Sequence, residues 1–330
     1  KDIIMTSEVL VEKLDIHYYR NRLYFKNDDH YITDNNLLLR AIDKLIQLKP
    51  SQHKQLLELF EIKATLQDDD DLPVQFANGY CLYDNEVMQV DPGFTPYYLD
   101  INYDPEAYDE HVDNFLDWFT CDRKDLRNVL EEMFGHVLMT KNFPHKSFFF
   151  WGERGNNGKS TLIKMLQNFA DGLHTNVPLD KFEDDTSVYS MIGKLLNVAD
   201  DIDASYLEKS SNFKTIASGD PVMVRPIYSS AITFQNKSTL VFTCNELPVF
   251  KDKSGGIKRR MQIIPCDAYV TKRDPDIDDK LSSDNAKSYL LNLALAGVER
   301  ILANGGLSKS KTIDDVTKQY FIHSDSVIAF

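Results

Sequence analysis

One short stretch constrains the fold of this chain more than any other, the run FFFWGERGNNGKSTLIKML at residues 148–166. It opens with four consecutive aromatic residues, which is the continuous apolar pattern of a strand buried on both faces. Three glycines follow, and from Ser160 onward the apolar residues recur at helical spacing. The pattern predicts a strand, a glycine-rich loop and a helix in direct succession.

This order of elements is the setting that a phosphate-binding loop (P-loop) requires. In such a loop the backbone N–H groups wrap a phosphate, a lysine reaches the β- and γ-phosphates, and a hydroxyl holds Mg²⁺. We therefore expect a site for ATP and Mg²⁺, with the hydroxyl of Ser160 as a metal ligand. The candidate nucleotide-binding residues are Gly152, Gly155, Asn157, Gly158, Lys159, Ser160 and Thr161.

The loop departs from the strict pattern G-x-x-x-x-G-K-[ST] at one position. That pattern would place its first glycine where this chain has Glu153, whereas Gly152 lies one residue earlier. The loop is thus one residue longer than the standard form. An ordinary strand–turn–helix corner is the alternative interpretation of the stretch.

Two later strands end in polar residues that suit a nucleotide site. The segment KLLNVADDID, residues 194–203, ends in Asp200 and Asp201. Asp200 would anchor Mg²⁺ largely through its waters, and Asp201 would polarise the water that attacks the γ-phosphate. A strand at 239–243 is followed by Asn245, which could orient the same water. The alternatives are a strand that runs into an acidic loop and an asparagine that opens a turn.

A basic loop precedes the next apolar strand. The segment KDKSGGIKRRMQIIP, residues 251–265, places five basic residues and two glycines ahead of that strand. A flexible loop that ends in a rigidly placed arginine suits an arginine finger, which supplies positive charge to a neighbouring subunit's transition state. A solvated basic loop is the alternative.

Composition limits the class of protein. The 330 residues suffice for two domains, and 42% hydrophobic residues with 11% aromatics are typical of a globular chain. We expect no membrane association, because no apolar run is long enough for a span and the N-terminus lacks a signal-peptide pattern. The cysteines are scattered, which fits a reducing cytoplasm. Because the chain starts on Lys, we expect it to be part of a longer protein.

The remaining segments predict a mixed α/β organisation. Residues 1–66 read as mostly helical after a short tyrosine-rich segment, and the alternation in 74–93 predicts small β-hairpins. Two amphipathic helices lead to the strand at 148. A further helix at 286–302 is closed by NGG, and the last residues are again periodic.

The glycine loop and the motifs NVADDID, SGDP, CNELP and KRRMQIIP occur in an order that resembles superfamily 3 helicases of the phage/plasmid primase–helicase family, which includes the poxvirus primase-helicase. Residues 76–145 resemble that family's N-terminal region. The resemblance implies an AAA+-like P-loop NTPase core at 143–270, behind a mainly helical N-terminal domain, 1–142, that contains a small β-hairpin region and serves as a collar or in oligomerisation. Residues 271–330 would form a C-terminal helical segment and the start of a truncated further element.

The resemblance also assigns roles to residues. It places Lys159 and Ser160 on the Walker A motif, Asp200 and Asp201 on the Walker B motif, and Asn245 on the sensor asparagine. The family's finger is the arginine directly before the strand. Arg260 is therefore the expected finger, and Arg259 is the alternative.

Related viral helicases carry a DNA-gripping hairpin between the Walker B motif and the sensor. The corresponding segment, 218–242, has the hairpin pattern but lacks the family's basic pair at its tip. We expect DNA contacts from Arg225, Tyr228 and Lys237, with the tyrosine stacking on a base.

The expected function is that of an ATP-driven DNA helicase, a hexameric ring that translocates on single-stranded or forked DNA during replication of a phage, plasmid or other mobile element. It would act in the cytoplasm of a bacterium or of the element's host cell, and a primase domain or subunit could accompany it. A formal net charge of −14 argues against general nucleic-acid binding. A ring resolves this conflict, because a few basic residues can line its channel. The alternatives are a replication-initiation or loader ATPase, a packaging-type motor and a P-loop kinase.

Overall fold

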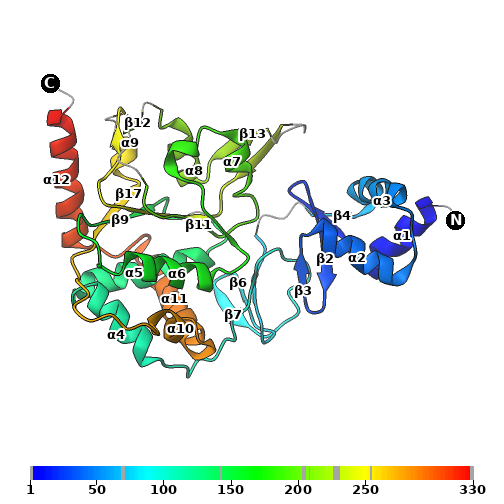
Figure 1. The fold of residues 1–330 in the computed structure, drawn as a ribbon, viewed down its shortest axis with the longest axis horizontal. Helices are drawn as coiled ribbons and strands as arrows, with labels where there is room; N and C mark the ends of the chain where they lie inside the picture. Colours follow the sequence, from blue (N-terminus) through cyan, green and yellow to red (C-terminus); the bar gives the residue numbers. More distant parts are fainter. Residues whose placement is uncertain are drawn as a thin grey trace.

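The computed structural model describes residues 3–67, 71–141, 143–202, 206–207, 209–225, 231–252 and 255–327. Its centre is a five-stranded sheet in the order β10-β11-β15-β9-β17, of which Figure 1 labels β9, β11 and β17. All of its pairings are parallel, so the carboxyl ends of the strands lie at one edge. The expected α/β class is therefore confirmed. The strands are β9 (Ser147–Trp151), β10 (His174–Thr175), β11 (Leu196–Ala199), β15 (Thr239–Cys244) and β17 (Met261–Pro265).

The aromatic run at the start of β9 fills both faces of this sheet. Phe148 and Phe150 pack into one hydrophobic cluster, and Phe149 packs into the other, where its ring stacks on Phe242 at 4.9 Å. All four rings are fully buried. The first face is covered by α4 (Glu110–Phe119), α5 (Lys124–Leu138), α6 (Lys159–Phe169), α10 (Ile277–Leu281) and α11 (Asp284–Asn304).

The second face is covered by smaller elements. They are η1 (Leu179–Lys181), α7 (Asp185–Tyr189), α8 (Ser211–Ser218), α9 (Gly255–Lys258) and α12 (Lys311–Val327), and Figure 1 shows α12 standing beside β17. Two short sheets lie on the same side. A parallel pair joins β12 (Tyr206–Leu207) to β16 (Val249–Phe250), and an antiparallel pair joins β13 (Pro221–Val224) to β14 (Ile232–Gln235).

The N-terminal part contains more β-structure than the sequence analysis predicted. The tyrosine-rich segment forms a hairpin whose turn, Arg20–Asn21, has positive φ at both residues, as the tight turns of hairpins require. This hairpin builds the sheet β3-β2-β1-β4, which the prediction of helix missed. The elements are α1 (Ile3–Lys13), β1 (His17–Tyr19), β2 (Arg22–Asn27), β3 (His30–Ile32), α2 (Asn35–Leu45), α3 (Pro50–Lys63) and β4 (Thr65–Leu66).

The hairpins predicted at 74–93 are confirmed. They form the sheet β7-β6-β5-β8, with a left-handed Gly79 in the first turn and the left-handed pair Asp84–Asn85 in the second. The strands are β5 (Val74–Phe76), β6 (Cys81–Tyr83), β7 (Glu86–Met88) and β8 (Tyr98–Leu99). Within the described ranges, no helix combines the length and the apolar character that crossing a membrane would require.

Helices α5 and α11 meet backbone to backbone at two glycines. A Cβ on Gly135 would lie 2.5 Å from the carbonyl oxygen of Ala294, and a Cβ on Gly297 would lie 2.5 Å from that of Glu131. Beside this contact Arg127 of α5 donates hydrogen bonds of 2.6–2.8 Å to Asp113, Asp117 and Glu131. These bonds fix α4, the helix that carries both aspartates, against α5.

We expect Gly297→Ala to lower the free energy of unfolding by about 1–3 kcal/mol, because the added methyl group forces α5 and α11 apart. The gain in helix propensity, about 1 kcal/mol, offsets only part of that cost. Urea denaturation measures the effect, with Glu299→Ala on the exposed side of α11 as the control. A Gly297→Ala protein as stable as the wild type would contradict the backbone contact.

Candidate functional site

The glycine-rich loop connects β9 to α6 at the carboxyl edge of the sheet. Gly158 is the N-cap of α6 and has φ +81°, a conformation that L side chains rarely adopt. A Cβ on Gly152 would lie 2.6 Å from Nδ2 of Asn157 and 3.0 Å from the carbonyl oxygen of Cys266, so a side chain at that position would be crowded. Asn157 is buried and donates from Nδ2 to the carbonyl oxygen of Arg154 at 2.8 Å. The conformation of the loop therefore depends on residues within the loop, namely the two glycines and Asn157.

Lys159, the first residue of α6, joins the ends of two strands. Its Nζ donates hydrogen bonds to the carbonyl oxygens of Gly152 (2.8 Å) and Cys244 (3.0 Å) and to Oδ1 of Asn245 (2.7 Å). These three bonds are as many as one ammonium group can donate. Lys159 and Asn245, which the sequence analysis expected to act together, are thus in direct contact.

The two acidic residues after β11 belong to the same group. Asn245 donates from Nδ2 to Oδ1 of Asp201 at 2.9 Å. Thr243 of β15 donates its hydroxyl proton to Asp200 and accepts a hydrogen bond from the backbone N–H of Asp201 at 2.8 Å. Asp201 has φ +50°, so the backbone turns sharply between the two carboxylates. Thr243, near the end of β15, therefore holds both aspartates, which follow the neighbouring strand β11.

These residues line an open cavity of about 980 Å³, within the size range of small-molecule sites. Gly155, Ser160 and Thr161 lie on its wall together with Asn157, Gly158 and Lys159. Three parts of the lining were not predicted from the sequence. They are Thr243, one face of α4, and the segment 270–278 after β17.

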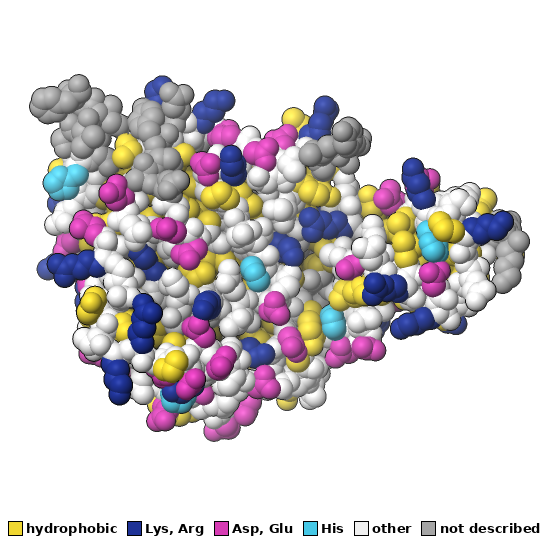
Figure 2. All heavy atoms as spheres, viewed as in Figure 1, with side chains coloured by type: hydrophobic (Ala, Val, Ile, Leu, Met, Phe, Trp, Pro, Cys, Tyr) yellow, Lys and Arg dark blue, Asp and Glu magenta, His cyan; other side chains and the backbone are white. Residues whose placement is uncertain are grey.

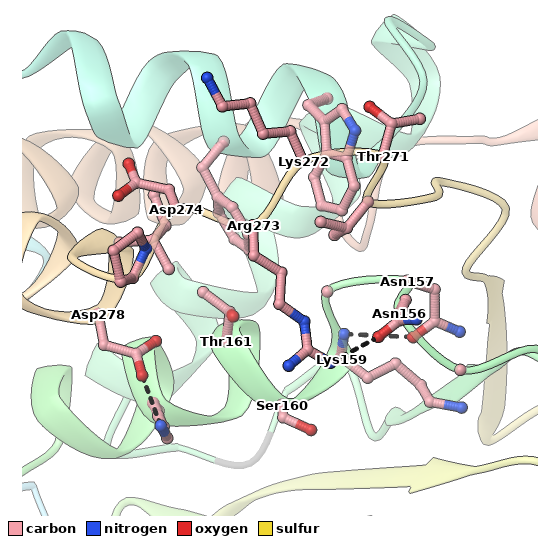
Figure 3. A pocket seen from close by; sticks show the side chains of 18 of the residues that line it. Asn156, Asn157, Lys159, Ser160, Thr161, Thr271, Lys272, Arg273, Asp274 and Asp278 are labelled. Atoms are coloured by element: carbon pink, nitrogen blue, oxygen red, sulfur yellow. Dashed lines mark hydrogen bonds and ion pairs between the residues drawn. The ribbon is translucent and has the colours of Figure 1, made fainter.

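Arg273 is the most prominent of the missed residues (Figure 3). Its side chain extends from the segment 270–278 toward the glycine-rich loop, where Nη2 donates to Oδ1 of Asn156 at 3.1 Å. The backbone N–H of Val270 donates to the carbonyl oxygen of the same asparagine at 2.8 Å. This contact could not be predicted from the sequence, since Arg273 lies in the polar stretch TKRDPD, far along the chain from the loop. Thr243 could have been identified as a candidate from the sequence, because it is a polar residue inside the largely apolar strand TLVFTC.

Two buried cysteines lie beside Lys159. Burial raises the pKa of the Cys244 thiol to about 12, although the nearby Lys159 ammonium acts in the opposite direction. Burial also raises the pKa of the Cys266 thiol strongly. Both therefore remain neutral thiols at physiological pH, and they pack behind the loop as apolar groups.

The two candidate finger arginines lie at the other edge of the sheet. Arg260 directly precedes β17, and its carbonyl oxygen accepts a hydrogen bond from the N–H of Ser147 at the start of β9 (2.7 Å). Its guanidinium is buried and donates to the hydroxyl of Ser218 and, at 2.7 Å, to the carbonyl oxygen of Gly256. Burial, followed by the charge of Arg259, lowers its pKa. Arg259 itself is exposed.

The expected DNA-binding residues do not meet at one place. Arg225 follows β13 at the end of the β13–β14 ladder where Val224 pairs with Ile232. Its backbone N–H donates to Asp185 at 3.1 Å. Lys237 lies beyond the opposite end, and burial and then Arg20 lower its pKa. Tyr228 lies outside the described residues. On the face in Figure 2, acidic and basic side chains are interspersed.

Comparison with known proteins gives three findings. Residues 150–260 match the model of a family of unknown function (DUF5906). In an alignment 287 residues long that covers 79% of this chain, the chain is 24% identical to "Putative helicase 121R" of Invertebrate iridescent virus 3, and it spans 30% of that protein.

The third finding concerns the fold. The chain resembles an A-form apo structure of the NrS-1 C-terminal region with a TM-score of 0.62 and 13% identity, over 97% of this chain and 75% of that one. A second apo structure of the same region gives a TM-score of 0.59 at 13% identity, over 94% and 76% of the two chains. At this identity the likeness shows a shared fold. The sequence similarity is to a protein named as a helicase.

We expect Thr243→Val to lower the free energy of unfolding by about 1–3 kcal/mol, because it removes two partly buried hydrogen bonds, those of the hydroxyl with the backbone N–H of Asp201 and with Asp200, at about 0.5–1.5 kcal/mol each. Valine matches threonine in shape, so packing is preserved. Urea denaturation of Thr243→Val and of Thr243→Ser, which keeps the hydroxyl, makes the comparison. Equal stability of the valine variant and the wild type would show that the hydroxyl does not hold the aspartates.

Proposed function

We propose that this chain is the ATP-hydrolysing motor of a DNA helicase of superfamily 3 type that moves along single-stranded DNA during replication of a mobile element. The observation that carries the proposal is the group at the carboxyl edge of the sheet. Lys159, Asn245 and Asp201, from three separate parts of the chain, are joined by hydrogen bonds beside the glycine-rich loop, and the hydroxyl of Thr243 binds the second carboxylate, Asp200. The similarity to a viral protein named as a helicase supports the same conclusion.

The residues at this edge fit a nucleoside triphosphate with Mg²⁺. Nothing lies within 4 Å of the position a Cβ would take on Gly155, so the loop has open space in front of it for a phosphate. Ser160 and Asp200 line the cavity and supply the oxygen ligands that Mg²⁺ prefers. Bound there, Mg²⁺ would neutralise charge on the phosphate oxygens.

Each polar residue has a distinct task in this proposal. Lys159 exchanges its bonds to strand-end carbonyls for bonds to the β- and γ-phosphates. Asp201 accepts a proton from the attacking water, and Asn245, already bonded to both Asp201 and Lys159, orients that water. Arg273 adds a second cation on the opposite side of the loop.

The positions of the arginines support a site shared between subunits. Arg259 and Arg260 lie at the amino end of β17, whereas the loop follows the carboxyl end of β9, about 13 Å away along a five-residue strand. An arginine at that edge serves a neighbour's site more readily than its own, as a ring of subunits permits. The family resemblance favours Arg260 as the finger. Arg259 is the more accessible of the two, because its side chain is exposed, and this favours Arg259.

The rest of the proposal follows the resemblance. Residues 143–270 form the motor, 1–142 a collar that assists assembly into a hexamer, and 271–330 a C-terminal helical segment. Single-stranded or forked DNA is the partner, and a primase domain or subunit acts with the motor. Strand displacement on a forked substrate separates a helicase from a loader or packaging ATPase, which would hydrolyse ATP without unwinding.

Lys159→Ala should reduce ATP hydrolysis by about 10²-fold or more, because no other group takes the place of the ammonium beside the β- and γ-phosphates. Phosphate release with and without single-stranded DNA measures the effect, and circular dichroism verifies the fold. Lys181→Ala, which removes an exposed lysine elsewhere, is the matched control. Normal turnover by folded Lys159→Ala would refute the proposed site.

The finger can be identified by mixing subunits. Arg259→Ala and Arg260→Ala are each combined with Lys159→Ala, which still donates a finger although its own site is inactive. The variant that lacks the true finger should bind ATP, lose about 10³-fold in hydrolysis alone, and recover part of it in the mixture. If neither arginine variant loses activity, or if co-assembled mixtures recover none, the active site is not shared.

A further inference from the structure

Helix α4 presents one face to the proposed ATP site, although it precedes the glycine-rich loop by some forty residues. The cavity is lined by His111, Asn114, Phe115 and Trp118. Their spacing of three, one and three residues places them on a single side of the helix. This wall belongs to none of the motifs from which the nucleotide site was predicted.

The wall is in contact with the phosphate end of the cavity. A Cβ on Gly158 would lie 2.7 Å from the indole ring of Trp118, so this ring packs directly on the last residue of the loop. Phe115 is buried beside it, with ring centroids 6.0 Å apart. The bonds from Arg127 to Asp113 and Asp117 hold the helix from another side. The aromatic pair is therefore fixed in position relative to the loop.

The opposite wall is the segment 270–278, which is also tied to the loop and to α6. Val270 and Arg273 bond to Asn156, and Asp278 forms an ion pair with Lys164. Figure 3 shows Arg273 and Asp278 reaching toward the loop and α6 from this segment. Pro275 and Ile277 add apolar surface to this side of the cavity.

The lining of the cavity is chemically mixed. Lys159, Asp200 and Asp201 line it beside the glycine-rich loop. The walls from α4 and the segment 270–278 supply apolar surface from Phe115, Trp118, Pro275 and Ile277, next to charged side chains such as Lys272 and Asp274. Asn114 lines the cavity with an exposed side chain, and among the described residues no hydrogen bond engages its carboxamide. Aromatic and apolar surface beside a few polar groups is typical of sites that bind small organic ligands.

We propose that the space between α4 and the segment 270–278 holds the purine base of the nucleotide, with Trp118 against the ring and the Asn114 carboxamide bonded to the base edge. On the edge of adenine that carries N6 and N7, an asparagine amide can donate to N7 and accept from the N6 amino group at the same time. Guanine presents two acceptors, N7 and O6, on that edge, so the amide nitrogen has a partner there but the amide oxygen has none, and the carboxamide favours ATP over GTP. This inference rests on the proposed function, since it names the base that the same site selects.

The test compares ATP, GTP and inorganic tripolyphosphate as ligands of the full chain by calorimetry. The wild type should bind ATP more tightly than either of the others. Asn114→Ala should weaken ATP binding about 10-fold, the loss expected for one hydrogen-bonded group, and should reduce the preference over GTP. Its affinity for tripolyphosphate should be unchanged, because the substitution lies outside the phosphate end of the cavity.

Two further variants sharpen the comparison. Glu110→Ala, on the same helix but outside the cavity, should bind all three ligands as the wild type does. ATP should change the indole fluorescence of the wild type, and this change should be smaller in Trp118→Phe, which retains the other tryptophan, Trp151.

The possible failures are distinguishable. If the wild type binds ATP no more tightly than tripolyphosphate, or if Asn114→Ala binds every ligand as the wild type does, the base lies elsewhere and the inference is wrong while the phosphate site stands. If the wild type binds neither ATP nor tripolyphosphate, the nucleotide site itself is refuted, and the proposed function with it.

Discussion

The parallel register of the central sheet is the constraint on which the site depends. Because β9, β11 and β15 run in the same direction, their last residues lie side by side, and the Lys159 ammonium can bond to the ends of both β9 and β15. Those oxygens, together with Asn245, compensate for the cost of partly burying a charge. A one-residue slip of β15 would turn Phe242 away from Phe149 and remove Thr243 from Asp200. Packing of the sheet and placement of the polar group are therefore fixed by the same pairing.

The walls of the cavity come from parts of the chain on either side of this sheet core. Helix α4 precedes β9 and is held through Arg127, while the segment 270–278 follows β17 and is held through Asn156. The glycine contact between α5 and α11 brings the preceding and following helices to within backbone distance of each other. The loop of the site is local in sequence, but the space in front of it exists only in the complete fold.

Features encoded by neighbouring residues could be predicted from the sequence. The strand, loop and helix around Lys159, the acidic residues after β11 and the hairpins at 74–93 all follow from local periodicity and turn residues. The first sheet was missed because its tight turn, Arg20–Asn21, contains no glycine to mark it. Contacts between distant segments, such as Arg273 with Asn156 or α4 with the cavity, leave no periodic pattern in the chain. They depend on tertiary packing and needed the structure.

Strand β17 has a mechanical consequence for the proposed motor. It lies at the margin of the sheet, and within the described part of the chain it is hydrogen-bonded to a strand on one side only, β9. One of its ends follows directly from the paired arginines, and the other leads into the segment that bonds to the glycine-rich loop. β17 pairs with β9 over its full length, so it connects the two edges of the molecule rigidly. In the proposed ring, a neighbouring subunit that displaces the two arginines would also displace the segment 270–278. A nucleotide bound in the cavity would, in turn, affect the contact of the arginines with that subunit.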